Sequence, residues 1–148
     1  MSSSMPRAES EAFLAGLHVG IVSIPDSGHG PLTVPIWYAY EPGGELRLVT
    51  ERASRKGKLL AKGVRVSLCA QTEAVPYKYV SVEGTVVAVE PADLERDIRP
   101  LAHRYLGREL GDRYVQATGA DRTAGGNVLI RIRPERWLSV DYAKRFPT

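Results

Sequence analysis

The residues best suited to chemistry are the cations that crowd segment 51–65. This segment carries six Arg or Lys and one Glu, a local charge of +5, in a chain whose formal net charge is only +3. The alternating pattern that ends at Thr50 predicts a strand, and Ser54 can cap a short helix after it. Arg55 and Lys56 then fall in the first turn of that helix, where the positive end of the helix dipole disfavours cations.

A bound anion would relieve this conflict between helix and charge. Backbone N–H groups at the start of a helix and nearby basic side chains converge on phosphate groups in many proteins. The alternative interpretation is a solvated charge run without a ligand, which is the commoner case for runs of this kind. The position of the cations at a strand-to-helix junction favours a phosphate site.

Length and composition limit the classes of protein to which the chain can belong. With 148 residues, 43% of them hydrophobic, we expect one globular domain over residues 1–148, of which 1–9 would be a flexible tail. No apolar run approaches the ~20 residues of a membrane span, and the N-terminus has no apolar signal core, so we expect neither a span nor export. One cysteine and three scattered histidines predict no metal site. Cys69 lies in a predicted strand, and a lone core thiol fits the reducing cytoplasm.

The hydrophobic pattern predicts a mainly β domain with a few peripheral helices. Strands are expected over 19–24, 32–40, 45–50, 64–71, 77–90 and 127–133, with Pro134 ending the last one and 136–140 resuming it. Helices are expected over 5–17 and 54–62, from Pro91 onward with Pro100 bending or splitting the stretch, and within 107–119, before a flexible loop at 119–126. A Pro-Gly-Gly turn at 42–44 predicts a hairpin between the second and third strands. Six strands joined mostly by hairpins predict a small antiparallel barrel, and no Gly-x-Gly-x-x-Gly turn supports a Rossmann unit.

Three motifs occur in an order that resembles a known family. They are Val34-Pro35-Ile36-Trp37-Tyr38, Thr50-x-x-x-Ser54-Arg55-Lys56 and Tyr79-Val80-Ser81-Val82-Glu83-Gly84-Thr85, each on or just after a predicted strand. Their order and spacing resemble the pyridoxamine 5′-phosphate oxidase-like superfamily of flavin-binding split β-barrels, over about residues 10–140. The resemblance implies a split antiparallel β-barrel that binds a flavin-type cofactor.

The resemblance also implies roles for single residues. Arg55 and Lys56 would hold the cofactor phosphate, and Thr50 would help to fix it. Tyr79 falls where the oxidases place a Gln that contacts the flavin, and Trp137 falls near a Trp that the second subunit contributes. The implied cofactor-binding set is Pro35, Ile36, Trp37, Thr50, Ser54, Arg55, Lys56, Tyr79 and Trp137. Because the site would borrow Trp137 from a neighbour, we expect a homodimer.

Two departures from the oxidases bear on the substrate. Pro35-Ile36-Trp37 replaces an Arg and a Lys on the ring-side strand, and the chain ends without their Arg/His-rich substrate motif. The pattern looks more like the actinobacterial branch that uses the 5-deazaflavin F420. This implies an F420-dependent oxidoreductase that transfers a hydride between the deazaflavin and an unsaturated or quinone-like small molecule. The further cations Arg52, Lys58 and Lys62 would suit the phosphate and glutamate tail of F420.

Two other functions remain open, and the sequence identifies no catalytic residue. The first is an FMN-binding split-barrel protein, either an enzyme or a flavin carrier. The second is a barrel that binds nucleic acid through segment 51–65, which we do not expect because that segment contains no aromatic residue for base stacking. Tyr38, Tyr79 and His29 could each donate a proton to a reduced product, but packing or loop roles are commoner for such residues.

Overall fold

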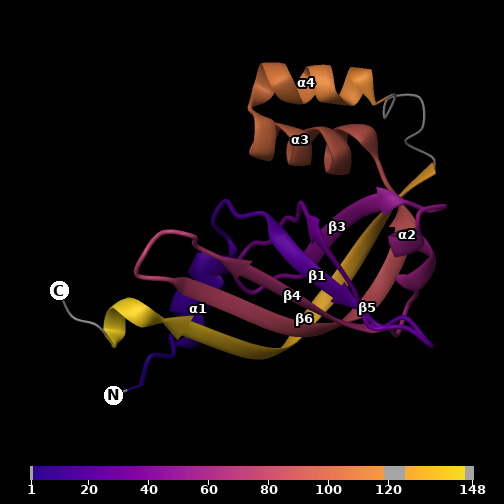
Figure 1. The fold of residues 1–148 in the computed structure, drawn as a ribbon. Coiled ribbons are helices and arrows are strands. Elements are labelled where there is room, and N and C mark those ends of the chain that lie inside the picture. Colours follow the sequence, from indigo (N-terminus) through magenta and orange to yellow (C-terminus); the bar gives the residue numbers. More distant parts are fainter. Residues whose placement is uncertain (1, 119–125, 146–148) are drawn as a thin grey trace.

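The fold is built on one curled antiparallel sheet (Figure 1). The computed structural model describes residues 2–118 and 126–145. The strands are β1 (Gly20–Ile24), β2 (Leu32–Ile36), β3 (Leu46–Glu51), β4 (Arg65–Gln71), β5 (Lys78–Pro91) and β6 (Asn127–Asp141). Their order is β2-β1-β4-β5-β6-β3, and the curl brings the two edges together where Ala39 and Arg47 exchange backbone hydrogen bonds of 3.0 and 2.9 Å. The predicted antiparallel split barrel with peripheral helices is confirmed.

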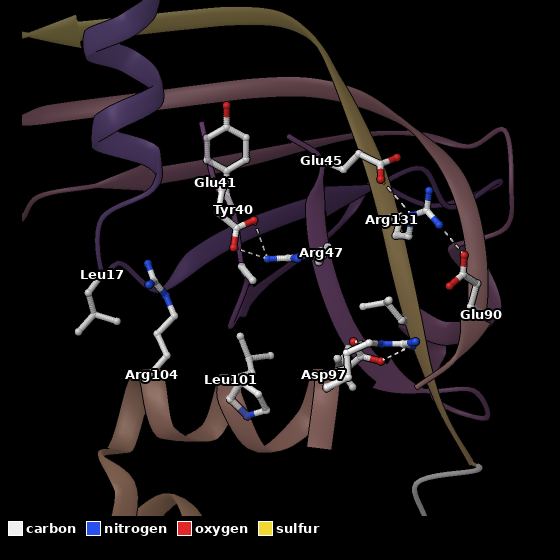
Figure 2. Close-up of a pocket in the computed structure, with 15 residues that line it drawn as sticks. Leu17, Tyr40, Glu41, Glu45, Arg47, Glu90, Asp97, Leu101, Arg104 and Arg131 are labelled. Atoms are coloured by element: carbon white, nitrogen blue, oxygen red, sulfur yellow. Dashed lines mark hydrogen bonds and ion pairs between the residues drawn. The ribbon is translucent and has the colours of Figure 1, made fainter. Parts of the chain in front are cut away.

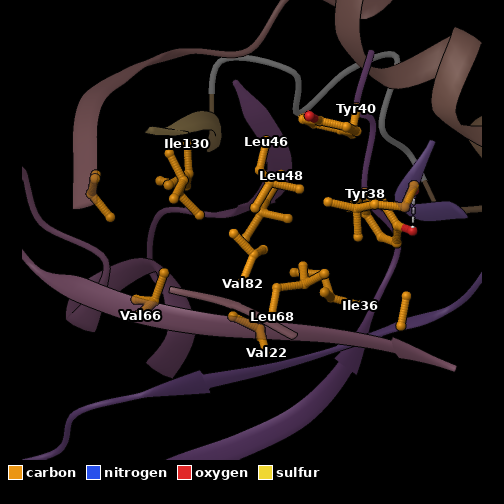
Figure 3. Close-up of a cluster of buried hydrophobic side chains, with 14 of the residues drawn as sticks. Val22, Ile36, Tyr38, Tyr40, Leu46, Leu48, Val66, Leu68, Val82 and Ile130 are labelled. Atoms are coloured by element: carbon orange, nitrogen blue, oxygen red, sulfur yellow. Dashed lines mark hydrogen bonds between the residues drawn. The ribbon is translucent and has the colours of Figure 1, made fainter. Parts of the chain in front are cut away.

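Alternation along each strand produces the barrel core. Along β1 and β3, buried residues alternate with partly buried ones, because successive side chains point to opposite faces of a strand. The inward set includes Val22, Leu48, Leu68, Val82 and Ile130, none of them more than 1% exposed. Figure 3 shows these side chains converging between the strands. The core therefore forms from the period-two pattern that predicted the strands.

Helices cover the ends and one edge of the barrel. They are α1 (Arg7–Leu14), α2 (Arg55–Leu59), the π-helical turn η1 (Leu94–Ile98), α3 (Arg99–Leu106), α4 (Arg108–Ala117) and a 3-10 turn, η3 (Tyr142–Lys144). The predicted split near Pro100 is confirmed, since η1 ends just before it and the proline stands in the first turn of α3, where its missing N–H costs nothing. Gly107, with φ +81°, turns the chain from α3 into α4, and the two helices stand off the barrel as a hairpin (Figure 1). The predicted loop at 119–126 lies outside the described residues except for Gly126.

The strand predicted to end at Pro134 instead continues to Asp141. Pro134 pairs with Gly84 next to a register shift between Glu83 and Gly84. At such a bulge the ladder is interrupted, so a residue without an N–H is tolerated. A side chain at Gly84 would place its Cβ 2.5 Å from the Arg133 carbonyl oxygen, so the close approach of the strands requires glycine here.

The predicted hairpin between the second and third strands is reduced to the Ala39–Arg47 bridge. β2 ends at Ile36 rather than at residue 40, and β3 pairs along its length with β6. The Tyr38 N–H donates to the Tyr105 hydroxyl at 3.1 Å instead of to a neighbouring strand. A side chain of α3 therefore ends the strand, which local sequence could not reveal.

Two further expectations concern single segments. Cys69 lies half-buried on the outward face of β4, not in the barrel core, because Leu68 and Ala70 take the inward positions. Burial raises the pKa of its thiol. Within 1–9, the expected tail, Met5 is 7% exposed and its N–H donates to Ser139 Oγ at 2.9 Å. No helix among the described residues is long and apolar enough to cross a membrane.

Candidate functional site

A groove of ≈ 530 Å³ brings together most of the predicted site residues. It lies where the ends of β2 and β3 and the start of α2 face the α3–α4 hairpin. It is lined by Val19, Pro35, Ile36, Trp37, Val49, Thr50, Glu51, Ser54, Lys56, Ile98, Leu101, Tyr114, Thr118 and Asn127, and is called the Trp37 groove below. Six of the nine residues in the predicted cofactor-binding set are among these: Pro35, Ile36, Trp37, Thr50, Ser54 and Lys56.

The junction between β3 and α2 forms the polar end of this groove. The Ser54 hydroxyl donates to the Glu51 carbonyl at 2.6 Å and accepts the Gly57 N–H at 3.1 Å, which confirms the predicted N-cap. Its single proton is therefore engaged, so the Thr50 hydroxyl is the donor in the 3.1 Å contact between Thr50 Oγ1 and Ser54 Oγ. The Thr50 oxygen keeps its acceptor capacity beside the groove.

Glycine at position 57 allows α2 to lie close to the turn that precedes it. A Cβ there would stand 2.2 Å from the Glu51 carbonyl oxygen and 2.7 Å from that of Arg52, so a side chain would displace the helix. This packing places Lys56 on the groove lining. Among the described residues Lys56 has no carboxylate within ion-pair distance, so its charge is available to a ligand.

Aromatic rings form the opposite end of the groove. Trp37 stacks on Tyr105 with ring centroids 5.0 Å apart and an angle of 4°, and Tyr114 tilts against Trp37 at 5.2 Å. The Tyr105 hydroxyl donates to the His18 carbonyl at 2.6 Å and accepts the Tyr38 N–H, which fixes this ring. Trp37 also packs against a small cluster of buried residues under the helical hairpin. Trp37 therefore lines the groove and also packs against the hairpin, while its role toward a cofactor stays a prediction.

Three predicted residues lie elsewhere in the chain. The exposed side chain of Arg55 forms an ion pair with Asp26, in the loop between β1 and β2, and does not line the groove. Tyr79 lies on the outward face of β5, opposite Gln71 and Val140. Trp137 packs edge-on against Tyr40 at 6.1 Å, away from the Trp37 groove of its own chain.

Sequence reasoning missed the residues that the helical hairpin contributes. Ile98, Leu101, Tyr114 and Thr118 close one side of the groove. The apolar spacing that includes Ile98 and Leu101 was visible in the sequence, but that pattern shows only that a helix packs, not which part of the barrel it faces. Tyr114 is 40% exposed, but the fold sets this exposure, so no signal in the sequence marked the residue as part of a site.

The tyrosines and histidine considered as proton donors do not meet at the groove. Tyr38 is fully buried in the barrel core, its hydroxyl donates to the Leu14 carbonyl at 2.6 Å, and burial raises its pKa well above the usual value. His29 is exposed in the β1–β2 loop and does not line the groove. No group of three or more His, Cys, Asp or Glu in the described part of the chain is arranged to hold a metal ion.

Comparison with known proteins identifies the family and the fold. The family model for pyridoxamine 5′-phosphate oxidase matches residues 6–141, so the chain belongs to this family. No curated protein matches the chain. Solved structures show which proteins share the fold. A conserved hypothetical protein from Mycobacterium tuberculosis is 24% identical over 98% of this chain and 91% of its own, with a TM-score of 0.75.

Two other structures carry cofactor names. An F420 reductase is 20% identical over 86% of this chain and 94% of its own, with a TM-score of 0.68. A FAD-binding protein from Mesorhizobium loti is 22% identical over 92% of this chain and 94% of its own, with a TM-score of 0.60. At these identities the likeness establishes the shared fold.

Proposed function

We propose that the Trp37 groove binds a flavin-type cofactor and that the protein is an F420-dependent oxidoreductase. The observation that carries this proposal is that six motif residues from two separate segments, 35–37 and 50–56, line one groove. The groove is bipolar, with aromatic and aliphatic side chains at one end and Thr50, Ser54 and Lys56 at the other. A ligand with a planar ring joined to a phosphate matches both ends.

The chain's own residues would bind and orient the ring and phosphate. The ring would lie against Pro35, Ile36 and Trp37. The phosphate would accept from the Lys56 ammonium and from the Thr50 hydroxyl, whose proton would turn from Ser54 Oγ to the phosphate. The cofactor, when bound, would supply hydride transfer, a reaction that does not require an acid–base pair among the described groove residues. The acceptor would be an unsaturated or quinone-like small molecule.

The choice of F420 over FMN rests on two features. Pro35-Ile36-Trp37 supplies no charged side chain on the ring side, as the resemblance to the deazaflavin branch implies. Arg52, Lys58 and Lys62 are exposed near α2, beyond the groove lining, where a longer anionic tail could reach them. An FMN-binding or FAD-binding protein of the same fold is the second candidate, supported by the FAD-binding relative.

A parallel titration with F420, FMN and FAD tests this proposal. We expect F420 to quench intrinsic tryptophan fluorescence with the lowest Kd, since Trp37 lies in the groove, and the quenching to disappear in Trp37→Leu. Tighter binding of FMN or FAD would select the second candidate. Absence of binding by all three would reject a cofactor role for the groove.

The proposed homodimer gains support from the outward face of the barrel. Strand register sets five residues in one row across the sheet: Pro35, Ile21, Cys69, Ser81 and Leu138. Leu138 is 59% exposed, and Pro35 lies at the edge of the Trp37 groove. A two-fold axis near the middle of the row would bring Leu138 of a second copy to that groove, whereas the Trp137 side chain lies on the opposite face of β6 against Tyr40.

Light scattering at micromolar concentration tests the dimer. We expect a dimer mass for the wild-type chain and a monomer for Leu138→Arg, with weaker cofactor binding in the variant. A wild-type monomer would contradict the proposed interface. A location in the cytoplasm stays a prediction from the sequence.

A further inference from the structure

A second groove, larger than the first, lies on the other side of Val49 and Leu101, which line both. Its volume is ≈ 830 Å³. It is lined by Leu17, Ala39, Tyr40, Glu41, Glu45, Arg47, Val49, Glu90, Arg96, Asp97, Pro100, Leu101, Arg104, Leu129 and Arg131, and is called the Arg104 groove below. Figure 2 shows it open between α3 and the outer face of β3 and β6.

Three of its four arginines are neutralised by carboxylates of the same groove. Arg47 donates to both oxygens of Glu41 at 2.8 Å, and Arg96 pairs with Asp97 at 2.8 Å. Arg131 bridges two acids on neighbouring segments, Glu45 at 3.0 Å and Glu90 at 2.6 Å. These ion pairs are drawn as dashed lines in Figure 2. They leave the charged side chains on that side of the groove already paired with one another.

Arg104 is different. Its Nη2 donates to the carbonyl oxygens of Ala15 and Gly16, both at 2.8 Å, just beyond the end of α1. Its Nε is buried and has no hydrogen-bond partner among the described residues, and no described carboxylate pairs with its guanidinium. Burial of an unsatisfied donor on a charged group is unfavourable, and the guanidinium lacks a counter-ion among the described residues. Because Nε is itself covered by protein, a ligand anion would meet this guanidinium through its Nη atoms.

Apolar surface lies beside this unsatisfied cation. Leu17 is 60% exposed and stands next to Arg104 at the mouth of the groove in Figure 2. Leu101, Leu129 and Pro100 continue the apolar lining inward. An exposed leucine at the rim of a groove marks surface that a ligand could cover.

We propose that the Arg104 groove binds a small molecule with an apolar body and a single carboxylate. The carboxylate accepts from the Arg104 guanidinium, and the apolar body covers Leu17, Pro100 and Leu101. A polyanion is disfavoured because four arginines and four acids line the groove, so it carries no excess positive charge. The volume lies within the range of small-molecule sites.

Decanoate and 1-decanol serve as matched probes, since they differ in the carboxylate alone. Calorimetric titration of the full chain is expected to give one decanoate site per chain, with a Kd about tenfold lower than for decanol. Equal affinities would overturn the role of the anion. Absence of decanoate binding up to millimolar concentration would overturn the proposal.

Two arginine variants separate a specific contact from general positive charge. Arg104→Gln is expected to weaken decanoate binding about tenfold, whereas Arg96→Gln, at a cation already paired with Asp97, leaves it within about twofold. Equal losses in both variants would show that charge alone attracts the probe, which contradicts the proposal. Because Arg104 also holds Ala15 and Gly16, thermal melting must accompany this comparison.

A second pair of variants avoids the folding role of Arg104. Leu17→Glu changes an exposed residue and places an anion beside the guanidinium, so we expect about a tenfold loss of decanoate affinity. Val75→Glu changes a residue that is 77% exposed and lines neither groove, and should leave affinity unchanged. An unchanged Kd in Leu17→Glu would overturn the proposed position of the ligand. Lys56→Ala should not alter decanoate binding, so this test is independent of the proposed cofactor site.

Discussion

The two grooves share a partition, Val49 and Leu101, but use charge in opposite ways. In the Trp37 groove, Lys56 has no described carboxylate partner and stands at the polar end of an aromatic cleft. In the Arg104 groove, most charges neutralise one another within ion pairs between nearby segments. Among the described cations that line them, Lys56 in one groove and Arg104 in the other have no carboxylate partner and are therefore available to a ligand.

The same contrast separates two neighbouring residues of the predicted phosphate motif. Arg55 and Lys56 are adjacent in the chain, yet Arg55 pairs with Asp26 while Lys56 lines the groove. A cation with a partner contributes little to binding an incoming anion, because the ligand must compete with an existing contact. Residue type alone therefore does not define a binding residue; its partners do.

Truncating Leu101, which lies between the two grooves, should have the largest effect on stability. Leu101→Ala is expected to lower the free energy of unfolding by about 2–4 kcal/mol, because it removes a side chain that is 9% exposed and leaves a cavity between the grooves. Urea unfolding measures this. Leu110→Ala, on a 52% exposed leucine of the same hairpin, is the control and should lose far less. Similar losses of unfolding free energy in both variants would mean that Leu101 is not a tightly packed residue between the two grooves.

Removing the free cation of the Trp37 groove should come next. Lys56→Ala is expected to weaken cofactor binding by about 1.5–3 kcal/mol and leave the fold intact, because a charge-assisted contact to phosphate is lost. Arg55→Ala should weaken it by less, since Arg55 is paired with Asp26 outside the groove lining. Binding isotherms for both variants decide the matter. A larger loss in Arg55→Ala would reverse the roles given to the two residues.

Removing the Tyr105 hydroxyl, which fixes the ring stacked on Trp37, should have a smaller effect on stability. Tyr105→Phe keeps the stack on Trp37 but loses the hydrogen bonds to the His18 carbonyl and the Tyr38 N–H, so we expect about 1–2 kcal/mol of lost stability. Cofactor affinity should fall while decanoate affinity does not. In Tyr114→Phe, the control, the lost hydroxyl has no hydrogen bond within the described part of the chain. Equal changes in the two variants would argue against a positioning role for the Tyr105 hydroxyl.

The smallest expected effect is on the stability of the α3–α4 hairpin. Of the two grooves, α4 lines only the Trp37 groove. Asp112 accepts from His103 at 2.7 Å and from Arg99 at 2.8 Å, and these hydrogen bonds hold the pKa of its carboxyl below the usual value. A lowered folded pKa stabilises the protein above the unfolded value and loses that contribution as pH falls. We therefore expect Asp112→Asn to reduce the drop in Tm between pH 7 and about pH 3. An identical drop in both proteins would contradict this contribution.

Much of the barrel could be predicted because strand signals are local. The outward and inward alternation along β1, β3 and β4 fixed which residues became core, and Ser54 capped α2 as expected. The end of β2 could not be predicted, because the Tyr105 hydroxyl that takes the Tyr38 N–H is 67 residues away in the chain. Pro134 was read as the end of a strand because the bulge opposite Gly84 is a property of the pair of strands.

For the site, the sequence by itself determined which residue types stand after β3 and on β2, and hence that an aromatic end and a polar end exist. Only the tertiary structure decided which of these residues meet. It turned Arg55 toward Asp26, placed the α3–α4 hairpin over Trp37, and left the Arg104 Nε without a hydrogen-bond partner in the part of the chain that the structure describes. The physical reason is that capping and alternation depend on neighbours a few residues away, whereas the pairing and burial of charges depend on segments that only folding brings together.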